Sequence, residues 1–322
     1  MKTTPTLALI LLASLWANAA TRAAEQPHRV GILTVSSAPG FGDGIAKNLE
    51  LKGYVLGSGL VIVVRSADGK LDRLPALARE LVAGAPEAIV TLGYPAAVAA
   101  RKATTTIPLV VASAGDPVAT GFAASLNRPG GDITGVSDVA SELSAKRLQL
   151  LKAAVPGLKR VAMLYNADDL GMTLRYKAAA AAAKGLGIAV EPLGVREPDD
   201  FDTAFAAMTR DRPDGIMMVT DVLTILNRKR VFEFAAAQHL PAIFEADNFV
   251  RDGGLMSYGP DGKERLARLA DLVDRILKGT RPADLPFELP TRFVLAINLK
   301  TAGAIGLAVP QLLLTEADEV IE

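Results

Sequence analysis

Short apolar runs rich in β-branched residues recur along the chain, and longer segments with helical periodicity separate them. An apolar run of about four to eight residues between turn signals is typical of a strand buried in a parallel sheet. Alternation of such strands with helices predicts an α/β fold built on parallel sheets. The predicted strands cover residues 30–35, 60–64, 88–92, 108–112, 160–165, 188–193, 215–220 and 241–244.

Apolar residues between the predicted strands repeat at the 3.6-residue period of an amphipathic helix. One such helix is expected to begin at Asp261, which stands before Glu264 in a spacing like that of a capping box. Gly279 is expected to end this helix. Its predicted buried face consists of Leu266, Leu269, Val273 and Ile276.

Three turn-rich breaks divide the alternation, at residues 127–138, at Gly253-Gly254 and at residues 285–290. The chain is also about twice as long as a typical domain of ~100–200 residues. We therefore predict two Rossmann-like lobes, each a parallel sheet flanked by helices, joined by three crossover segments. The predicted limits are residues 28–136 plus 257–288 for lobe 1, and residues 137–256 plus 289–322 for lobe 2.

The first 24 residues have the pattern of a cleavable secretory signal peptide. Lys2 provides a positive start, and residues 7–17 are apolar apart from Ser14. Ala17-Asn18-Ala19 then offers small residues at a possible cleavage site. The apolar stretch is shorter than the ~20 residues of a membrane-spanning helix. We expect residues 1–24 to be removed on export, and no direct membrane insertion of the rest.

Cysteine is absent from the chain, which excludes disulfides, thiolate metal ligands, thiol catalysis and a lipid-anchored cysteine. An exported chain of this length without disulfides fits the bacterial periplasm, because a large core can stabilise it. Lys and Arg together number 35, as do Asp and Glu together. This balance gives no reason to expect nucleic acid as a partner.

The sequence contains few candidates for metal, cofactor or catalytic chemistry. Only two histidines occur, His28 and His239, and neither has a partner at metal-ligand spacing. No metal or cofactor is therefore expected, and no carboxylate, lysine, serine or tyrosine pair stands out as catalytic. The segment Gly40-Phe41-Gly42-Asp43-Gly44 lacks the G-x-G-x-x-G spacing of a dinucleotide loop. We interpret it as a mobile loop at a cleft.

Small and polar residues follow the carboxyl ends of the predicted strands, where open parallel sheets bind ligands. Each of them alone fits ordinary turn and helix-cap chemistry. Together they predict a polar cleft between the lobes. The candidate binding residues are Ser36, Ser37, Gly93, Tyr94, Pro95, Ser113 and Asp116 in lobe 1, with Tyr165, Asn166, Asp221 and Asp247 in lobe 2.

This set of residues suits a small zwitterion. Backbone amides and serine hydroxyls can hold its carboxylate, and an acidic side chain can hold its ammonium group. Asp116, Asp221 and Asp247 are equally good candidates for the ammonium contact, and the sequence pattern does not choose among them.

Four longer segments carry a family resemblance: residues 65–75, 107–121, 127–136 and 253–259. With them the chain resembles the ABC transporter substrate-binding proteins of the type that includes tryptophan-binding members. The resemblance implies a type I periplasmic binding protein that is not an enzyme and that binds an amino acid, aromatic ones included. The pocket positions that match are Ser36, Ser37, Gly93, Tyr94, Pro95, Ser113, Asp116, Asn166 and Asp221.

The expected partners follow from this resemblance. They are an amino acid or small carboxylate as ligand and a membrane permease with its own ATPase, and the chain is expected to be a monomer. Two other functions stay open at this point: an exported enzyme on the same fold, and a ligand-sensing subunit of a membrane receptor.

Overall fold

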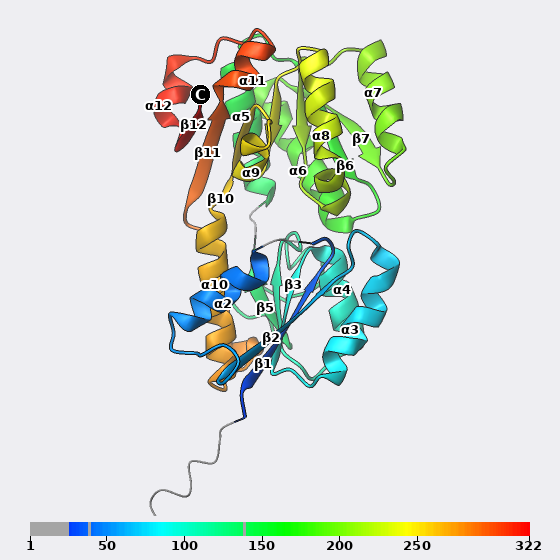
Figure 1. Ribbon diagram of the computed structural model, residues 1–322. Coiled ribbons are helices and arrows are strands. Elements are labelled where there is room, and N and C mark those ends of the chain that lie inside the picture. The colour runs from blue at the N-terminus through cyan, green and yellow to red at the C-terminus, as the bar shows by residue number, and fades with distance from the viewer. Residues whose placement is uncertain (1–25, 38–39, 138–139) are drawn as a thin grey trace, which may run out of the picture.

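The computed structural model describes residues 26–37, 40–137 and 140–322, which form two lobes, one above the other in Figure 1. The predicted signal peptide, residues 1–24, lies outside the described residues. Within those ranges, no helix combines the length and the apolar character that crossing a bilayer requires.

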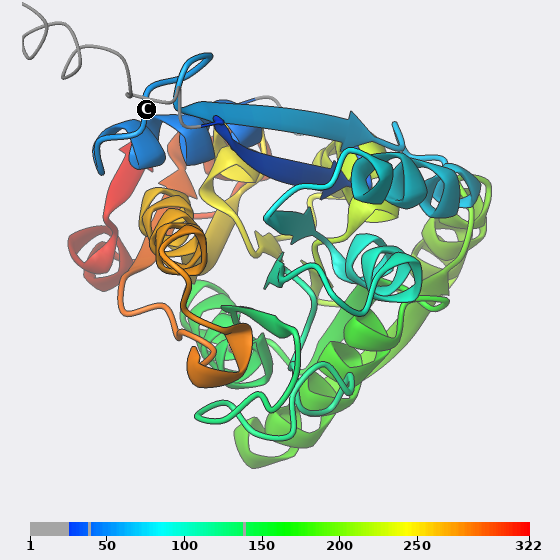
Figure 2. The same ribbon diagram turned by 90° about the horizontal axis from the view of Figure 1, so that it is seen from below.

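The first lobe is built on a five-stranded sheet in the order β2-β1-β3-β4-β5, with every neighbouring pair parallel. Its strands are β1 (His28–Thr34), β2 (Leu60–Ser66), β3 (Ala88–Leu92), β4 (Leu109–Ala112) and β5 (Ile133–Val136). The helices on one face are α3 (Leu74–Ala83) and α4 (Tyr94–Ala103), and those on the other are α2 (Phe41–Glu50) and α10 (Gly262–Leu277). Figure 2 shows these helices around the strands from below.

The second lobe is built on a seven-stranded sheet in the order β12-β11-β10-β9-β8-β6-β7. Its strands are β6 (Arg160–Asn166), β7 (Ala189–Val195), β8 (Gly215–Met218), β9 (Ala242–Phe244), β10 (Met256–Pro260), β11 (Phe293–Asn298) and β12 (Glu319–Ile321). Neighbours are parallel except β10 and β11, which are antiparallel. The helices on one face are α5 (Ala140–Ala154), α6 (Leu170–Leu186), α11 (Leu299–Ala304) and α12 (Gln311–Glu316), and those on the other are α7 (Asp200–Arg210), α8 (Val222–Ala237) and α9 (Asp247–Arg251).

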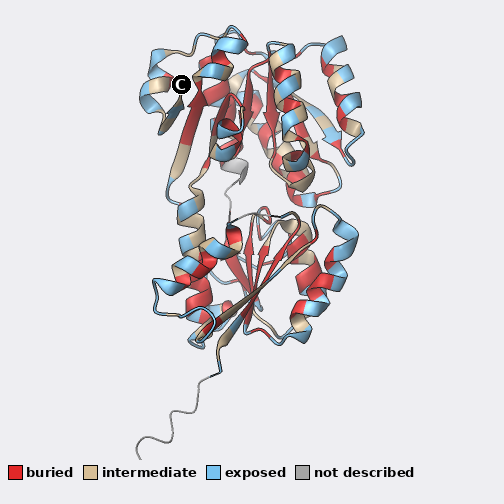
Figure 3. Ribbon diagram, viewed as in Figure 1, coloured by how far each residue is buried: buried red, intermediate tan, exposed pale blue. Residues whose placement is uncertain are grey.

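The apolar runs in the middle of each sheet become strands that are buried on both faces, whereas β2 and β7, towards the sheet edges, are partly exposed (Figure 3). Ile32 packs with α2 and α10, whereas the next residue, Leu33, packs with α3 and α4. Successive side chains of a strand point to opposite faces, so a strand covered by helices on both sides needs an unbroken apolar run. The predicted fold class and all eight predicted strands are confirmed, and the strand ends differ by at most two residues.

The chain passes between the lobes three times. It leaves the first sheet after β5, returns between β10 and α10, and leaves again between the 3-10 helix η2 (Pro282–Asp284) and β11. The predicted boundary before residue 257 is a few residues too early, because β10 ends at Pro260 and pairs with β9 and β11 of the second sheet. The turn at Gly253-Gly254 therefore lies inside the second lobe, and the crossing follows Pro260.

The glycine-rich segment after β1 is not a loop over the part that the structure describes. Gly40 has a φ of 78° and precedes α2, and residues 41–44 form the first turn of that helix. A Cβ atom on Gly44 would lie 2.7 Å from Leu266 of α10. The glycines therefore allow α2 to pack closely against α10, which corrects the interpretation as a mobile loop.

β4 and β5 approach each other closely at Gly135, beside the first crossing. A Cβ atom on Gly135 would lie 2.1 Å from the carbonyl oxygen of Val111. Because backbone cannot yield as a flexible side chain does, Gly135→Ala is expected to lower the free energy of unfolding by at least ~3 kcal/mol. Gly131→Ala is the control, since no atom lies within 4 Å of its added Cβ. Equal denaturation midpoints for the two variants would contradict this packing.

Candidate functional site

In both lobes, the loops at the carboxyl ends of several strands lie on the side that faces the other lobe. Some of these loops are in contact. A Cβ atom on Gly69, after β2, would lie 2.8 Å from Cδ1 of Leu226 on α8. A Cβ atom on Gly115, after β4, would lie 3.2 Å from Cα of Gly171 on α6. Val222, at the start of α8, packs against the apolar cluster of the first lobe. Gly115 and Val222 adjoin the predicted residues Asp116 and Asp221, so these two stand next to points of contact between the lobes.

The first-lobe candidates follow β1 and β3. Ser36 is half-buried and Ser37 is exposed. Gly93 precedes α4 with a φ of 95°, a left-handed conformation that favours glycine. Tyr94 and Pro95 form the first turn of α4, and the Tyr94 ring lies 5.6 Å from the ring of Phe122. Backbone amides at the start of α4 have no side-chain cap.

Ser113 lies beside the crossings. It has a φ of 51° and lines a small cavity with residues of the first and second crossings. The other lining residues are Val136, Ser137, Pro260, Arg265 and Pro290.

Two of the three candidate acids are engaged in their own local structure. Asp116 is exposed, and its Oδ1 accepts hydrogen bonds from the backbone amides of Val118 (2.8 Å) and Ala119 (3.1 Å). Asp247 forms an ion pair of 2.7 Å with Arg251, which also binds Glu319 of β12. These contacts are the turn and surface roles that short polar residues ordinarily have.

The third acid, Asp221, lies at the start of α8 beside another predicted residue. Its Oδ2 accepts a 2.7 Å hydrogen bond from Nδ2 of Asn166, which is buried at the end of β6. Its Oδ1 accepts hydrogen bonds from the backbone amide and hydroxyl of Thr224, both at 2.8 Å, in a capping box. The structure thus brings together two residues that are far apart in the sequence.

Tyr165, the neighbour of Asn166, packs within the second lobe. Its ring stacks on the ring of Tyr176 of α6 with 5.0 Å between centroids and 3° between planes. Burial raises the pKa of the Tyr165 hydroxyl. One face of the Tyr165 ring is therefore covered by Tyr176 within the second lobe.

Asp169 belongs to the same cluster and was missed by the sequence reasoning. It is 5% exposed, and its Oδ1 accepts a 3.2 Å hydrogen bond from the amide of Met172 as the N-cap of α6. Burial raises the pKa of its carboxyl to about 6, although the amide of Met172 opposes this, and the charge of Asp221 raises it further. An acid just before a helical pattern was the available signal.

A buried ion cluster around Glu245 holds the segments of the second lobe that carry Asp169 and Asp221. Glu245, after β9, accepts hydrogen bonds from Nη1 of Arg147 (2.9 Å) through Oε1 and from Nη1 of Arg175 (2.8 Å) through Oε2. The amide of Thr220 donates to the same Oε2 at 2.9 Å, and Nε of Arg147 donates to the carbonyl of Tyr258 at 2.7 Å. Burial alone would raise the pKa of Glu245, but the two guanidinium charges lower it. Sequence reasoning missed both arginines, since a charge on a helix usually marks its solvated face.

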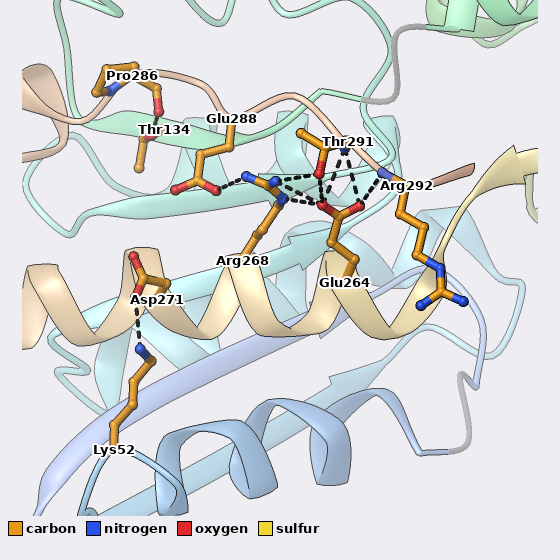
Figure 4. A network of polar contacts seen from close by, with 9 residues as sticks. All are labelled: Lys52, Thr134, Glu264, Arg268, Asp271, Pro286, Glu288, Thr291 and Arg292. Atoms are coloured by element: carbon orange, nitrogen blue, oxygen red, sulfur yellow. Dashed lines mark hydrogen bonds and ion pairs between the residues drawn. The ribbon is translucent and has the colours of Figure 1, made fainter. Parts of the chain in front are cut away.

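A second polar network holds the third crossing against the first lobe (Figure 4). Glu264 of α10 accepts hydrogen bonds from the amides of Thr291 (3.2 Å) and Arg292 (2.9 Å) and from Arg268 (2.8 Å). Burial would raise the pKa of Glu264, yet the hydroxyl of Thr291, Arg268 and the two amides lower it to about 2 by donating hydrogen bonds to the carboxylate. Glu264 therefore does not complete a capping box as predicted, and Asp261 caps α10 through the amide of Lys263 at 2.7 Å.

Two α/β lobes with contacting strand-end loops and three crossings define a type I periplasmic binding protein, as the sequence predicts. Residues 30–321 match the family described as ABC transporter substrate binding protein, so the chain belongs to this family. This confirms the resemblance stated from the sequence. The family consists of solute-binding components, and the chain is therefore a binding protein and not an enzyme.

Individual relatives support the same assignment. The tyrosine-binding protein of Clostridioides difficile (strain R20291) is 26% identical over 264 residues, covering 82% of this chain and 76% of that protein. A conserved domain protein from Vibrio cholerae O1 biovar El Tor has a TM-score of 0.86 at 25% identity, covering 91% of this chain and 99% of that one. An ABC domain from Streptococcus pneumoniae in complex with L-Trp has a TM-score of 0.85 at 26% identity, covering 92% and 100%.

Glu245→Ala tests the buried ion cluster. The substitution leaves two buried guanidinium groups without their shared carboxylate, so the free energy of unfolding is expected to fall by about 3–5 kcal/mol. Asp247→Ala, two residues away, removes a half-exposed ion pair with Arg251 and is expected to cost only about 0–1 kcal/mol. Chemical denaturation measures both, and similar losses for the two variants would contradict the difference in burial.

Asp169→Asn tests the cost of the buried Asp169 charge. The folded pKa of about 6 lies above the ordinary 3.8, so ionisation is penalised in the folded state. The resulting loss of stability develops as the pH rises from about 4 to 6 and is complete above 6. Asn keeps the N-cap acceptor without the charge, so the variant is expected to be more stable at pH 8 by about 2–3 kcal/mol. At pH 3 its stability should equal that of the wild type, and a constant difference across this range would refute the assignment.

Proposed function

We propose that this protein captures an amino acid between its two lobes and delivers it to the membrane permease of an ABC importer, which has its own ATPase. The observation that carries the proposal is the cluster of Asn166, Asp169 and Asp221, which lies beside the points where Gly171 and Val222 contact the first lobe. The names of two relatives, a tyrosine-binding protein and a domain solved with L-Trp, favour an amino acid, including an aromatic one.

Asp221 is the proposed partner of the ligand's ammonium group, with Asp169 beside it. Within the described residues neither carboxylate forms an ion pair, whereas Asp247 is paired with Arg251 and Asp116 caps its own turn. Burial and, to a smaller extent, the nearby charge of Asp221 make ionisation of Asp169 costly, as its raised pKa indicates, although the charge of Arg175 opposes this. A cationic ligand group between them would relieve that cost.

The first lobe is proposed to hold the carboxylate and side chain of the ligand. Ser36 and Ser37 offer hydroxyl groups, and the uncapped start of α4 after Gly93 offers amides and a favourable dipole. The half-buried ring of Tyr94 offers a flat apolar face for the side chain. Ligand contacts from both lobes would stabilise the closed arrangement over the open one, which is what a closing binding protein requires.

The chain is also proposed to be exported from the cytoplasm. We infer that residues 1–24 are removed and that the remaining chain acts as a monomer in the periplasm, with no metal and no cofactor. It would then reach its permease by diffusion, because it has no cysteine to carry a lipid anchor.

Asp221→Asn tests the ammonium contact. Asn keeps the helix-cap acceptor but places its amide nitrogen against Nδ2 of Asn166, so the melting temperature should fall modestly. Loss of the charge should weaken binding of L-tyrosine or L-tryptophan about 10- to 100-fold. Isothermal titration calorimetry at pH 7.5 measures the affinity. Alanine is less suitable here because Asp221 caps α8 and its removal would cost ~1 kcal/mol of stability.

Asp116→Asn and Asp247→Asn are the matched controls, since both acids were equal candidates from the sequence. Each is expected to leave the affinity within about twofold of the wild type. A larger loss in either control than in Asp221→Asn would reassign the ammonium contact. A thermal-shift screen with amino acids and small carboxylates tests the ligand class, since a tight ligand raises the melting temperature by mass action.

A further inference from the structure

The lobes meet backbone to backbone at two glycines. Gly115 lies in the loop after β4 of the first lobe, and Gly171 is the second residue of α6 in the second lobe. A Cβ atom on Gly115 would lie 3.2 Å from Cα of Gly171, and a Cβ atom on Gly171 would lie 3.6 Å from Cα of Gly115. The latter atom would also lie 3.7 Å from the carbonyl oxygen of Ala114. The last two distances are ordinary van der Waals contacts, so the gap beside Gly171 admits a methyl group, whereas a larger side chain would meet the backbone of the first lobe.

Gly171 is not explained by its own helix. Its φ is not in the left-handed region, and glycine inside a helix costs ~1 kcal/mol relative to alanine. Gly185 in the same helix has no atom within 4 Å of an added Cβ. At residue 171, by contrast, an added Cβ would be tight against Oδ1 of Asp169, at 3.2 Å, and would already be in contact with Gly115 and Ala114 of the first lobe.

We propose that Gly115 and Gly171 form the closing contact of this binding protein: their lack of side chains allows the lobes to meet, and the pair thereby sets ligand affinity. This inference rests on the proposed function, whose closed state it defines. The other interlobe contacts, of Val222 with the first-lobe cluster and of Leu226 with Gly69, lie on α8 and require the same approach of the lobes.

The energetic consequence follows from a two-state equilibrium between open and closed lobes. A ligand that contacts both lobes binds tightly only to the closed state, so apparent affinity scales with the closed fraction. A side chain at residue 171 larger than a methyl group would have to occupy the space of the first-lobe backbone. It would lower the closed fraction without unfolding either lobe.

Thiol crosslinking without ligand tests the closing contact. The chain has no cysteine, so Lys70→Cys with Leu226→Cys supplies one thiol on each lobe, because exposed Lys70 adjoins Gly69, which lies against Leu226 in this structure. A short bismaleimide joins them only when the lobes approach. In this background Gly171→Val is expected to slow crosslinking about tenfold, while Gly185→Val, in the same helix, leaves the rate unchanged.

Gly171→Ala is the second variant in case valine prevents folding, which circular dichroism and the melting temperature would reveal. It is expected to slow crosslinking to a smaller extent than valine, with Gly185→Ala as its control. If a residue 171 variant and its residue 185 control crosslink at the same rate, whether slowed or not, the proposed closing contact is wrong.

Calorimetry with L-tyrosine and L-tryptophan separates this inference from the proposed function. If the wild type binds either one, Gly171→Val should weaken binding by the same factor as it slows crosslinking. An unchanged affinity would contradict the proposal. If the wild type binds neither, the amino acid assignment fails, while the crosslinking rates still decide whether these glycines control closure.

Discussion

The starts of α6 and α8 in the second lobe depend on one interaction: Glu245 forms buried ion pairs with both Arg147 and Arg175. Arg147 comes from α5 and Arg175 from α6, and Glu245 also binds the amide of Thr220, just before α8. One buried carboxylate therefore fixes the starts of the two helices that carry Asp169, Gly171 and Asp221. The two guanidinium charges, with the amide of Thr220, balance the desolvation of Glu245, so removing any one of the three charges would leave the others buried without full compensation.

Polar contacts within the first lobe hold most of the third crossing. Glu264 and Arg268 of α10 bind the segment from Glu288 to Arg292, and Glu288 also exchanges backbone hydrogen bonds with β5 and Ser137. This segment is thereby attached to the first lobe up to the start of β11. Changes in the angle between the lobes must then be absorbed where these bonds end, which among the described residues is near Ser137, residues 260–262 and residues 292–293.

Local structure could be predicted because its causes lie close together along the chain. The run of residues 88–92 is apolar apart from Thr91, since helices cover both faces of β3, and the strand appears with those limits. Asp261 stands just before the apolar period of α10 and caps it. β10 could not be assigned to its lobe in this way, because its membership depends on pairing with β9 and β11 rather than on its own residues.

The sequence by itself determined the α/β alternation, the presence of two lobes and the strand ends at which polar residues gather, because each of these depends on periodicity among neighbouring residues. Tertiary structure decided what each polar residue does. Asp116, Asp221 and Asp247 look alike in the sequence, yet one caps a turn, one joins Asn166, and one pairs with Arg251. Arg147 and Glu245, 98 residues apart, meet only in the fold. A carboxylate acquires its role from the charges and donors across from it, and chain neighbours do not specify those.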